Sequence, residues 1–186
     1  MTPELRTERL LLRGWREEDK LPYSLLNADP EVMRHFPSTL SAQQSDEMVD
    51  HMAKAWDTRG FGLWAVERLD TRSFIGFVGL SRPSWAATPC VEVGWRLAHA
   101  QWGHGFAPEA ARAALAFGFA HVVLPDYEIV SFTTTKNLKS QRVMQKIGMH
   151  HDVGRDFDHP LLPTWDERRH VLFSIDRPAW WASVAR

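Results

Sequence analysis

The sequence predicts one mixed α/β domain spanning residues 1–186, with helices flanking a central sheet. Three observations support this fold class. The length suits a single domain that buries a substantial core. Segments with strand alternation and segments with helix start and stop residues follow one another along the whole chain. No repeat, low-complexity tract or linker interrupts that succession.

Turn and capping residues divide the first half of the chain. Pro30 follows Asp29 and marks a helix start, because a first helical residue needs no N–H donor. Ser41 is expected to cap a longer helix that passes through Trp56 and ends near Gly60. In order, the expected elements are a strand at 9–15, helices at 19–27, 31–36 and 42–56, and strands at 61–68 and 74–81 joined by a link of hairpin length.

The second half is expected to alternate strands and helices. Asn137 can cap a helix that runs through Ile147, and Gly148 can end it. The sheet is therefore expected to be mostly antiparallel at its start and parallel further along. In order, the expected elements are a loop at 85–89, a strand at 91–97, a helix at 108–122, a strand at 128–134, the helix capped by Asn137, and strands at 149–155 and 168–175 around a loop at 156–166.

Composition excludes several classes of protein. The formal net charge is −1, which gives no global electrostatic reason to bind nucleic acid or a membrane surface. Cys90 is the only cysteine, so a disulfide framework and a CxxC metal pair are excluded. We see no signal peptide or membrane-spanning run, and a cytoplasmic location is expected. The nine tryptophans are expected to fill the core and line a groove.

The most informative segment is Trp102-Gly103-His104-Gly105-Phe106-Ala107-Pro108, between the strand at 91–97 and an Ala-rich helix. The first turn of a helix has unpaired N–H donors, and glycines let a phosphate approach the backbone. We therefore expect a phosphate cradle, with Pro108 at the helix start. The dinucleotide motif GxGxxG fails because Pro108 stands at the third glycine, and the P-loop fails because no Gly-Lys-Ser/Thr follows.

This glycine loop resembles the acyl-CoA loop of the GNAT superfamily of N-acetyltransferases, which has the pattern Gln/Arg-x-x-Gly-x-Gly/Ala. Trp102 stands where Gln or Arg is usual, and this version resembles the RimJ/RimL branch, whose members acetylate ribosomal-protein N-termini among other amines. The resemblance implies that the backbone of Trp102, Gly103, His104, Gly105, Phe106 and Ala107 holds the coenzyme pyrophosphate. The alternative is a tight strand-to-helix turn without a ligand.

A second segment, Asn137 to Met149, resembles the superfamily's Asn-x-x-Ser…Lys-x-Gly-Phe block. The resemblance implies that Asn137 contacts the pantetheine arm and that Ser140 is the acid for the leaving thiolate. Arg142 lies in this segment and is a candidate phosphate contact, with a solvated surface charge as the alternative. Met144 occupies the position of the usual catalytic Tyr and cannot donate a proton. The alternative is that Asn137 and Ser140 only cap a helix.

The resemblance also implies that the sheet splays between its fourth and fifth strands, here 91–97 and 128–134. The pantetheine then pairs with the backbone of the first, at Trp95, Arg96 and Leu97. Alternation places Glu92, Gly94 and Arg96 on one face of that strand. Glu92 is a candidate base for an ammonium, and a Glu92–Arg96 or cross-strand ion pair is the alternative.

These expectations describe an acetyl-CoA-dependent N-acetyltransferase that acts by direct attack, without a metal or a covalent enzyme intermediate. The acceptor is a peptide N-terminus or a small-molecule amine. The rival is a non-catalytic acyl-CoA-binding sensor or scaffold. His150 and His151 point to opposite faces of a strand and cannot chelate together, and a metal site is not expected at 156–160. Trp180 and Trp181, expected to be exposed, suggest a contact surface for a homodimer.

Overall fold

The computed structural model describes residues 2–86, 88–124 and 128–184, and it has the expected mixed α/β fold with a mostly antiparallel sheet. Within these residues the only parallel pair of neighbouring strands is β5 and β6. Residue 87, in the predicted loop at 85–89, lies outside the described residues. The sheet order is β1 (Leu5–Arg6), β2 (Leu10–Arg13), β3 (Leu63–Arg68), β4 (Phe74–Ser81), β5 (Glu92–Leu97), β6 (Glu128–Thr134), β9 (Arg169–Asp176) and β7 (His150–His151), with β8 (Phe157–Asp158) also paired to β9.

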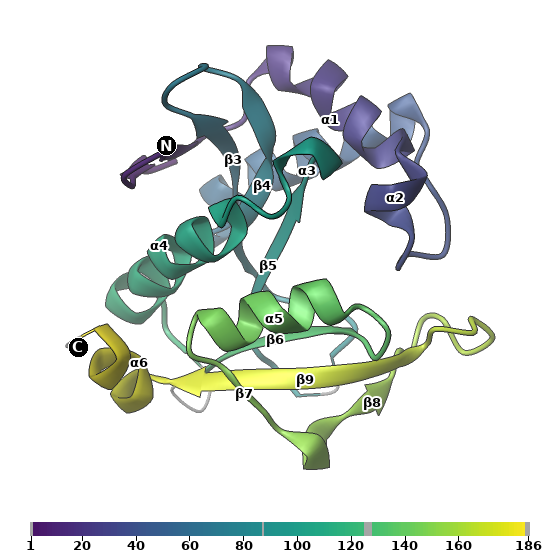
Figure 1. Cartoon of the computed structure of the whole chain (residues 1–186), viewed down its shortest axis with the longest axis vertical. Coiled ribbons are helices and arrows are strands. Elements are labelled where there is room, and N and C mark those ends of the chain that lie inside the picture. Colours follow the sequence, from purple (N-terminus) through teal and green to yellow (C-terminus); the bar gives the residue numbers. More distant parts are fainter. Residues whose placement is uncertain (1, 87, 125–127, 185–186) are drawn as a thin grey trace.

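Helices cover both faces of the sheet (Figure 1). Phe77 on β4 points to one face, where it packs with residues from α1, α2 and α3. Its neighbour Val78 points to the other face and joins the larger core beneath α4. The helices are η1 (Glu17–Asp19), α1 (Lys20–Ala28), α2 (Pro30–Met33), α3 (Ala42–Arg59), η2 (His99–Gln101), α4 (Phe106–His121), α5 (Leu138–Lys146), η4 (Val153–Arg155) and α6 (Arg177–Val184).

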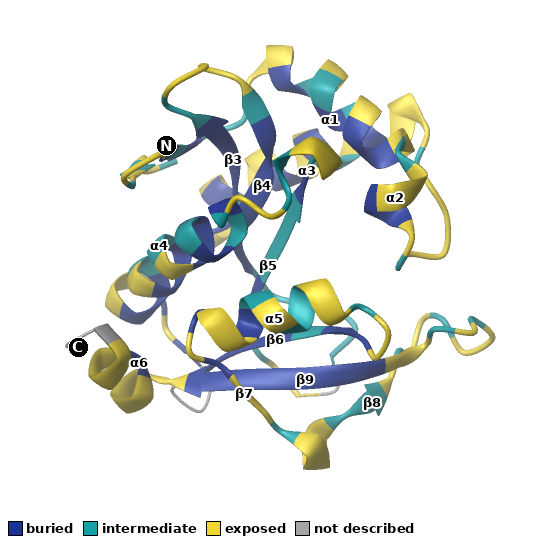
Figure 2. Ribbon diagram, in the orientation of Figure 1, coloured by how far each residue is buried: buried dark blue, intermediate teal, exposed yellow. Residues whose placement is uncertain are grey.

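The buried segments in Figure 2 follow this division, with dark strands at the centre and exposed outer faces on the helices. None of the helices in the described ranges is long and apolar enough to cross a membrane.

The predicted caps are confirmed. Ser41 Oγ accepts from the backbone N–H of Gln44 at 3.2 Å, and the Gln44 side chain accepts in return from the Ser41 N–H. Gly60 ends α3 in the left-handed conformation (φ 73°), which glycine adopts without a Cβ clash. The Asn137 side chain caps α5. These local signals therefore place two helices within a few residues of their observed limits.

Several predicted boundaries are wrong, each for a local reason. Helix α4 begins at Phe106 rather than at Pro108, because Gly103 and Gly105 both turn the chain with φ 81°. Pro108 is its third residue, where the backbone still needs no N–H partner. The predicted strand at 149–155 pairs only over β7, since the chain then turns through η4. The predicted loop at 156–166 contains the short strand β8.

The C-terminal end differs most from the sequence-based expectation. Helix α6 was not predicted, and Asp176 Oδ1 accepts from the Ala179 N–H at its first turn. Trp180 is only 3% exposed and stacks on Phe119, so the expectation that it is exposed is wrong. Trp181 is 54% exposed, as expected.

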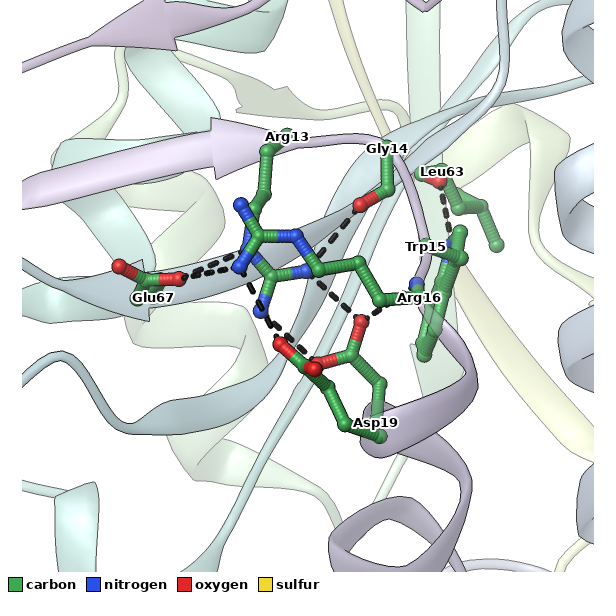
Figure 3. A network of polar contacts seen from close by, with 8 residues as sticks. Arg13, Gly14, Trp15, Arg16, Asp19, Leu63 and Glu67 are labelled. Atoms are coloured by element: carbon green, nitrogen blue, oxygen red, sulfur yellow. Dashed lines mark hydrogen bonds and ion pairs between the residues drawn. The ribbon is translucent and has the colours of Figure 1, made fainter.

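A buried ionic network fixes the start of the helices on the α1–α3 side (Figure 3). The guanidinium of Arg13 binds both carboxylate oxygens of Asp19, at 2.7 and 2.8 Å, and its Nε donates to Glu67 at 2.8 Å. All three side chains are at most 5% exposed. Burial opposes the charged form of Arg13, but the hydrogen bonds to Asp19 and Glu67 outweigh it and raise the pKa. The network therefore links β2, η1 and β3 and holds η1 against the sheet.

Candidate active site

The parallel strands β5 and β6 pair only at one end. Their only bridge within the described residues is Glu92↔Val130, and the Val130 N–H donates to the Val91 carbonyl at 2.9 Å. Beyond this point the strands diverge, as Figure 1 shows. A cleft of about 1050 Å³ opens there. It is lined by β5, the glycine loop, α5, β6 and the segment between β8 and β9.

The open edge of β5 offers backbone groups to this cleft. Because the Val91 carbonyl faces β6 and the direction alternates along a strand, the polar groups of Trp95 and Leu97 also face the gap. The indole Nε1 of Trp102 donates to the Leu97 carbonyl at 2.9 Å. The Leu97 carbonyl is therefore already hydrogen-bonded to Trp102, whereas the backbone N–H and carbonyl of Trp95 face the gap.

The glycine loop has the geometry that a pyrophosphate requires. A Cβ built on Gly103 meets no atom within 4 Å, and Gly105 is the N-cap of the 16-residue helix α4. The first N–H groups of this long helix are unpaired and lie at the positive end of its dipole. The loop lines the cleft through Trp102, Gly103, Gly105, Phe106 and Ala107. His104 carries an exposed side chain and is not among the lining residues.

The loop is braced from the N-terminal side of the molecule. Arg9 donates through Nε to Glu109 at 2.7 Å and through Nη1 to the His104 carbonyl at 2.9 Å. Thr7 Oγ1 also donates to Glu109, at 2.6 Å. The Arg9 guanidinium lies 4.7 Å from the centre of the Phe106 ring. Sequence reasoning missed this support, because about a hundred residues separate its two sides.

Helix α5 forms the opposite wall. The Asn137 Oδ1 accepts from the Ser140 N–H at 3.2 Å, and its Nδ2 donates to Thr133 at 3.0 Å. The capping role of Asn137 is therefore present. Ser140 receives this cap through its backbone, so its hydroxyl is left for other partners in the cleft that it lines. Met144 is fully buried in the core and does not line the cleft.

A row of cations follows the same helix. Lys139, Arg142 and Lys146 stand three and four residues apart and all line the cleft. Positions with this spacing share one helix face. The Lys139 ammonium lies 4.4 Å from the centre of the Trp102 ring, so the row begins beside the glycine loop. The two walls together suit a ligand with several phosphate charges.

Glu92 lies at the closed end of the gap. Ser81 Oγ donates to Glu92 Oε2 at 3.1 Å, and Glu92 is ion-paired with no cation in the described residues. The alternative of a Glu92–Arg96 ion pair is therefore not observed. Burial raises the pKa of Glu92 to about 7, although the hydrogen bond from Ser81 lowers it in part. A carboxyl group with this pKa can take a proton near neutral pH.

Aromatic and imidazole side chains line the cleft on the other side of Glu92. Burial lowers the pKa of His159 and of His170, so both imidazoles favour the neutral form. His35 lines the cleft and contacts Glu167 at 2.9 Å, whereas Trp15 and Trp85 are not among the lining residues. The aromatic and imidazole residues that line the cleft include Phe36, Phe77, Phe132, His159, Trp165 and His170. No group of three or more metal-ligating side chains occurs in the described part of the chain.

A sheet split between two parallel strands, with a glycine-loop helix start on one side, is the arrangement that the resemblance to acyl-CoA-dependent transferases implied. The family model of the acetyltransferase (GNAT) domain matches residues 9–150. The chain belongs to this family, and it is an acetyl-CoA-dependent N-acetyltransferase.

Individual relatives agree with this assignment. The chain is 32% identical over 149 residues to the uncharacterised protein YkkB of Bacillus subtilis, covering 80% of this chain and 86% of YkkB. It is 29% identical over 189 residues to the FsC-acetyl coenzyme A-N(2)-transacetylase of Aspergillus fumigatus, covering 96% and 78%.

Solved structures have the same fold. An acetyltransferase from Agrobacterium tumefaciens superposes with a TM-score of 0.77 at 27% identity, covering 95% of this chain and 96% of that one. Mycobacterium smegmatis RimJ, solved with CoA-disulfide, superposes with a TM-score of 0.73 at 19% identity, covering 95% and 88%. At 19% identity, the RimJ structure shows that the two proteins share a fold.

Proposed function

We propose that the acetyl group passes directly from acetyl-CoA to an amine bound beside Glu92, with Glu92 as the base and Ser140 as the acid. The observation that carries this proposal is the position of Glu92. Its carboxyl group lines the cleft at the point where β5 and β6 separate, with a pKa raised to about 7. An ammonium group that enters this cleft therefore meets a proton acceptor matched to neutral pH.

The donor half of the cleft fits coenzyme A. The loop from Trp102 to Ala107 would hold the pyrophosphate through backbone N–H groups, and Arg142 lies in the adjacent row of cations. The open backbone of β5 at Trp95 and Leu97 would pair with the pantetheine arm, and Asn137 lines the same cleft. The backbone carbonyl of Arg96 lies against Gly76 of β4, so the predicted backbone contact at Arg96 is not available to the pantetheine. Acetyl-CoA supplies an activated thioester when bound.

Glu92 and Ser140 then carry out the proton transfers. Glu92 accepts a proton from the ammonium, directly or through water, and frees the lone pair that forms the new N–C bond. As the C–S bond breaks, the nitrogen of the new N–C bond loses its second proton to solvent, and Ser140 Oγ gives its proton to the sulfur and recovers one from solvent. Holding both reactants in one cleft supplies much of the rate.

A covalent route through Cys90 is disfavoured. Burial, together with the nearby Glu92 carboxylate, raises the pKa of the Cys90 thiol. A neutral thiol is a poor nucleophile, so an acetyl-enzyme on this residue is not expected.

Release of free CoA from acetyl-CoA in the presence of an amine panel tests the proposal. The wild-type protein should release CoA in step with N-acetylated product, and Glu92→Gln and Ser140→Ala should both slow that release. If both variants turn over at the wild-type rate, the assignment of base and acid is wrong. Tight coenzyme binding without release for any amine would instead favour the non-catalytic acyl-CoA-binding module.

Three further expectations are part of the proposal. Residues 1–186 act as one domain, the protein works in the cytoplasm, and it forms a homodimer without nucleic acid or membrane partners. The exposed Trp181 supports a contact surface near α6, although its neighbour Trp180 is buried. Light scattering of the wild-type protein and of Trp181→Ala tests the dimer.

A further inference from the structure

Arg96 is a partly buried cation without an acidic partner among the described residues. Its side chain lines the cleft on the face of β5 that also carries Glu92. Nη1 donates to Asn27 Oδ1 at 2.6 Å, whereas the buried Nε has no hydrogen-bond partner in the described part of the chain. The guanidinium carbon lies 4.3 Å from the centre of the Phe36 ring and 5.6 Å from that of Phe77. Burying a charged group without a counter-charge is unfavourable, so this site favours an anion.

The charged side chains near Arg96 already form ion pairs with one another. Glu31 and Arg34, on the α2 side of the cleft, lie 3.5 Å from each other. His35 lies 2.9 Å from Glu167, which Lys136 also approaches to 3.5 Å. Arg96 makes no ion pair with any described residue, so it stands apart from these matched groups. Among the charged groups on this side of the cleft, Arg96 is therefore the one that the anionic group of an acceptor would neutralise.

Glu92 and Arg96 form two separate ends of one site. Gly94 lies between them on the same strand face, and a Cβ built there would be 3.7 Å from Glu92 Oε1. The Glu92 carboxyl therefore leans along the strand over Gly94 and is hydrogen-bonded to Ser81 rather than to Arg96. The missing side chain at Gly94 leaves room between the two charged groups.

We propose that the acceptor is a small amine that also carries a carboxylate, with its ammonium group at Glu92 and its carboxylate at Arg96. This inference rests on the proposed function, because it extends the same acceptor site. An Arg guanidinium binds a carboxylate through charge-assisted hydrogen bonds, and Nη2, which makes no hydrogen bond with the described residues, is the donor on the cleft side. A polyamine would place a second ammonium group against Arg96, and a long peptide would place a neutral amide there.

Matched pairs of acceptors test the inference. Glycine, β-alanine and γ-aminobutyrate are compared with their amides, which lack only the negative charge, by kcat/KM for release of CoA. The kcat/KM of the acid should exceed that of its amide by about tenfold or more for at least one chain length. In Arg96→Gln this ratio should fall to near one, whereas in Arg34→Gln, at the rim of the same cleft, it should be retained.

A second variant guards against loss of folding in Arg96→Gln. Asn27→Asp places a carboxylate on the existing 2.6 Å contact and should lower the acid-to-amide ratio while Arg96 remains. Equal kcat/KM for acids and amides at every chain length would overturn the inference, as would a ratio that survives Arg96→Gln.

Calorimetry separates this inference from the proposed function. The acids should bind to the CoA-saturated wild-type protein more tightly than their amides, even if no turnover occurs. Absence of that difference overturns the carboxylate inference, whereas binding without acetylation of any amine overturns the catalytic proposal alone.

Discussion

Arg9 and Glu109 form a 2.7 Å hydrogen bond between the chain preceding β2 and the first turn of α4, and the same guanidinium holds the His104 carbonyl at 2.9 Å. The proposed pyrophosphate site is therefore shaped by a contact from the N-terminal segment. Its effect on the donor site can be measured separately from the chemistry.

Glu109→Ala is expected to raise KM for acetyl-CoA by about tenfold, the value of one charge-assisted hydrogen bond, with a smaller change in kcat. The carboxylate accepts from Thr7 and Arg9, so its removal loosens the loop. Steady-state kinetics with acetyl-CoA as the varied substrate gives both constants. Glu8→Ala, an exposed neighbour, is the control, and an equal KM in both variants would contradict the bracing role.

Glu92→Gln is expected to lower kcat/KM for the amine by about 10²- to 10⁴-fold, as for loss of a general base. Activity of the wild-type protein should rise as pH increases through about 7, where the Glu92 carboxyl loses its proton. The variant should lack this rise. The pH profile of kcat/KM measures both effects, and an unchanged rise in Glu92→Gln would assign the titration to another group.

The same substitution is expected to stabilise the protein above pH 7. The pKa of Glu92 is about 7 when folded and 4.5 ordinarily, so the folded state binds the proton more tightly. The contribution of the Glu92 carboxyl group to the free energy of unfolding is fully present below pH 4.5 and is lost as pH rises through 7. Glu92→Gln should therefore exceed the wild-type free energy of unfolding by about 3 kcal/mol at pH 8 and match it at pH 4. Urea titrations at pH 4 and pH 8 measure both free energies of unfolding. The same difference between variant and wild type at the two pH values would contradict this account.

Ser140→Ala is expected to lower kcat by about 10- to 100-fold while leaving KM for acetyl-CoA and the melting temperature nearly unchanged. The Asn137 cap uses the backbone N–H of residue 140, which alanine retains. Asn137→Ala removes the cap and serves as the comparison, with a loss of stability of about 1 kcal/mol. A kcat for Ser140→Ala within twofold of wild type would exclude Ser140 as the acid.

Asp19→Asn is expected to destabilise the protein by about 3 kcal/mol, because it leaves the buried Arg13 charge with one carboxylate instead of two. Equilibrium unfolding in urea measures this difference. Glu18→Gln, whose side chain is 72% exposed, should change stability by less than about 0.5 kcal/mol. Equal effects from the two substitutions would mean that the Arg13 network does not hold η1 in place.

Local signals predicted much of the fold. Ser41, Gly60 and Asn137 act through neighbours within a few residues, and each occupies its expected cap. Helix α6 was missed because its stability depends on Trp180 packing against Phe119, a contact 61 residues away in sequence. The strand after Met149 was overextended because the turn at η4 interrupts its pairing with β9.

The parts of the candidate site that lie within a single strand or loop were predictable. Alternation placed Glu92, Gly94 and Arg96 on one face, and the loop motif located the donor side. The partners of these residues were not predictable. Ser81 reaches Glu92 from β4, and Asn27 reaches Arg96 from α1, so both contacts depend on how the strands and helices pack.

The central claim is direct acetyl transfer to an amine within this cleft. Its most direct test is mass spectrometry of the wild-type protein with acetyl-CoA, with and without a pool of amines that includes γ-aminobutyrate, spermidine and short peptides. We expect free CoA and one or more N-acetylated amines in equal amounts, with the protein itself unmodified. Coenzyme binding without any acetylated amine, or an acetyl group carried on the protein, would contradict the claim.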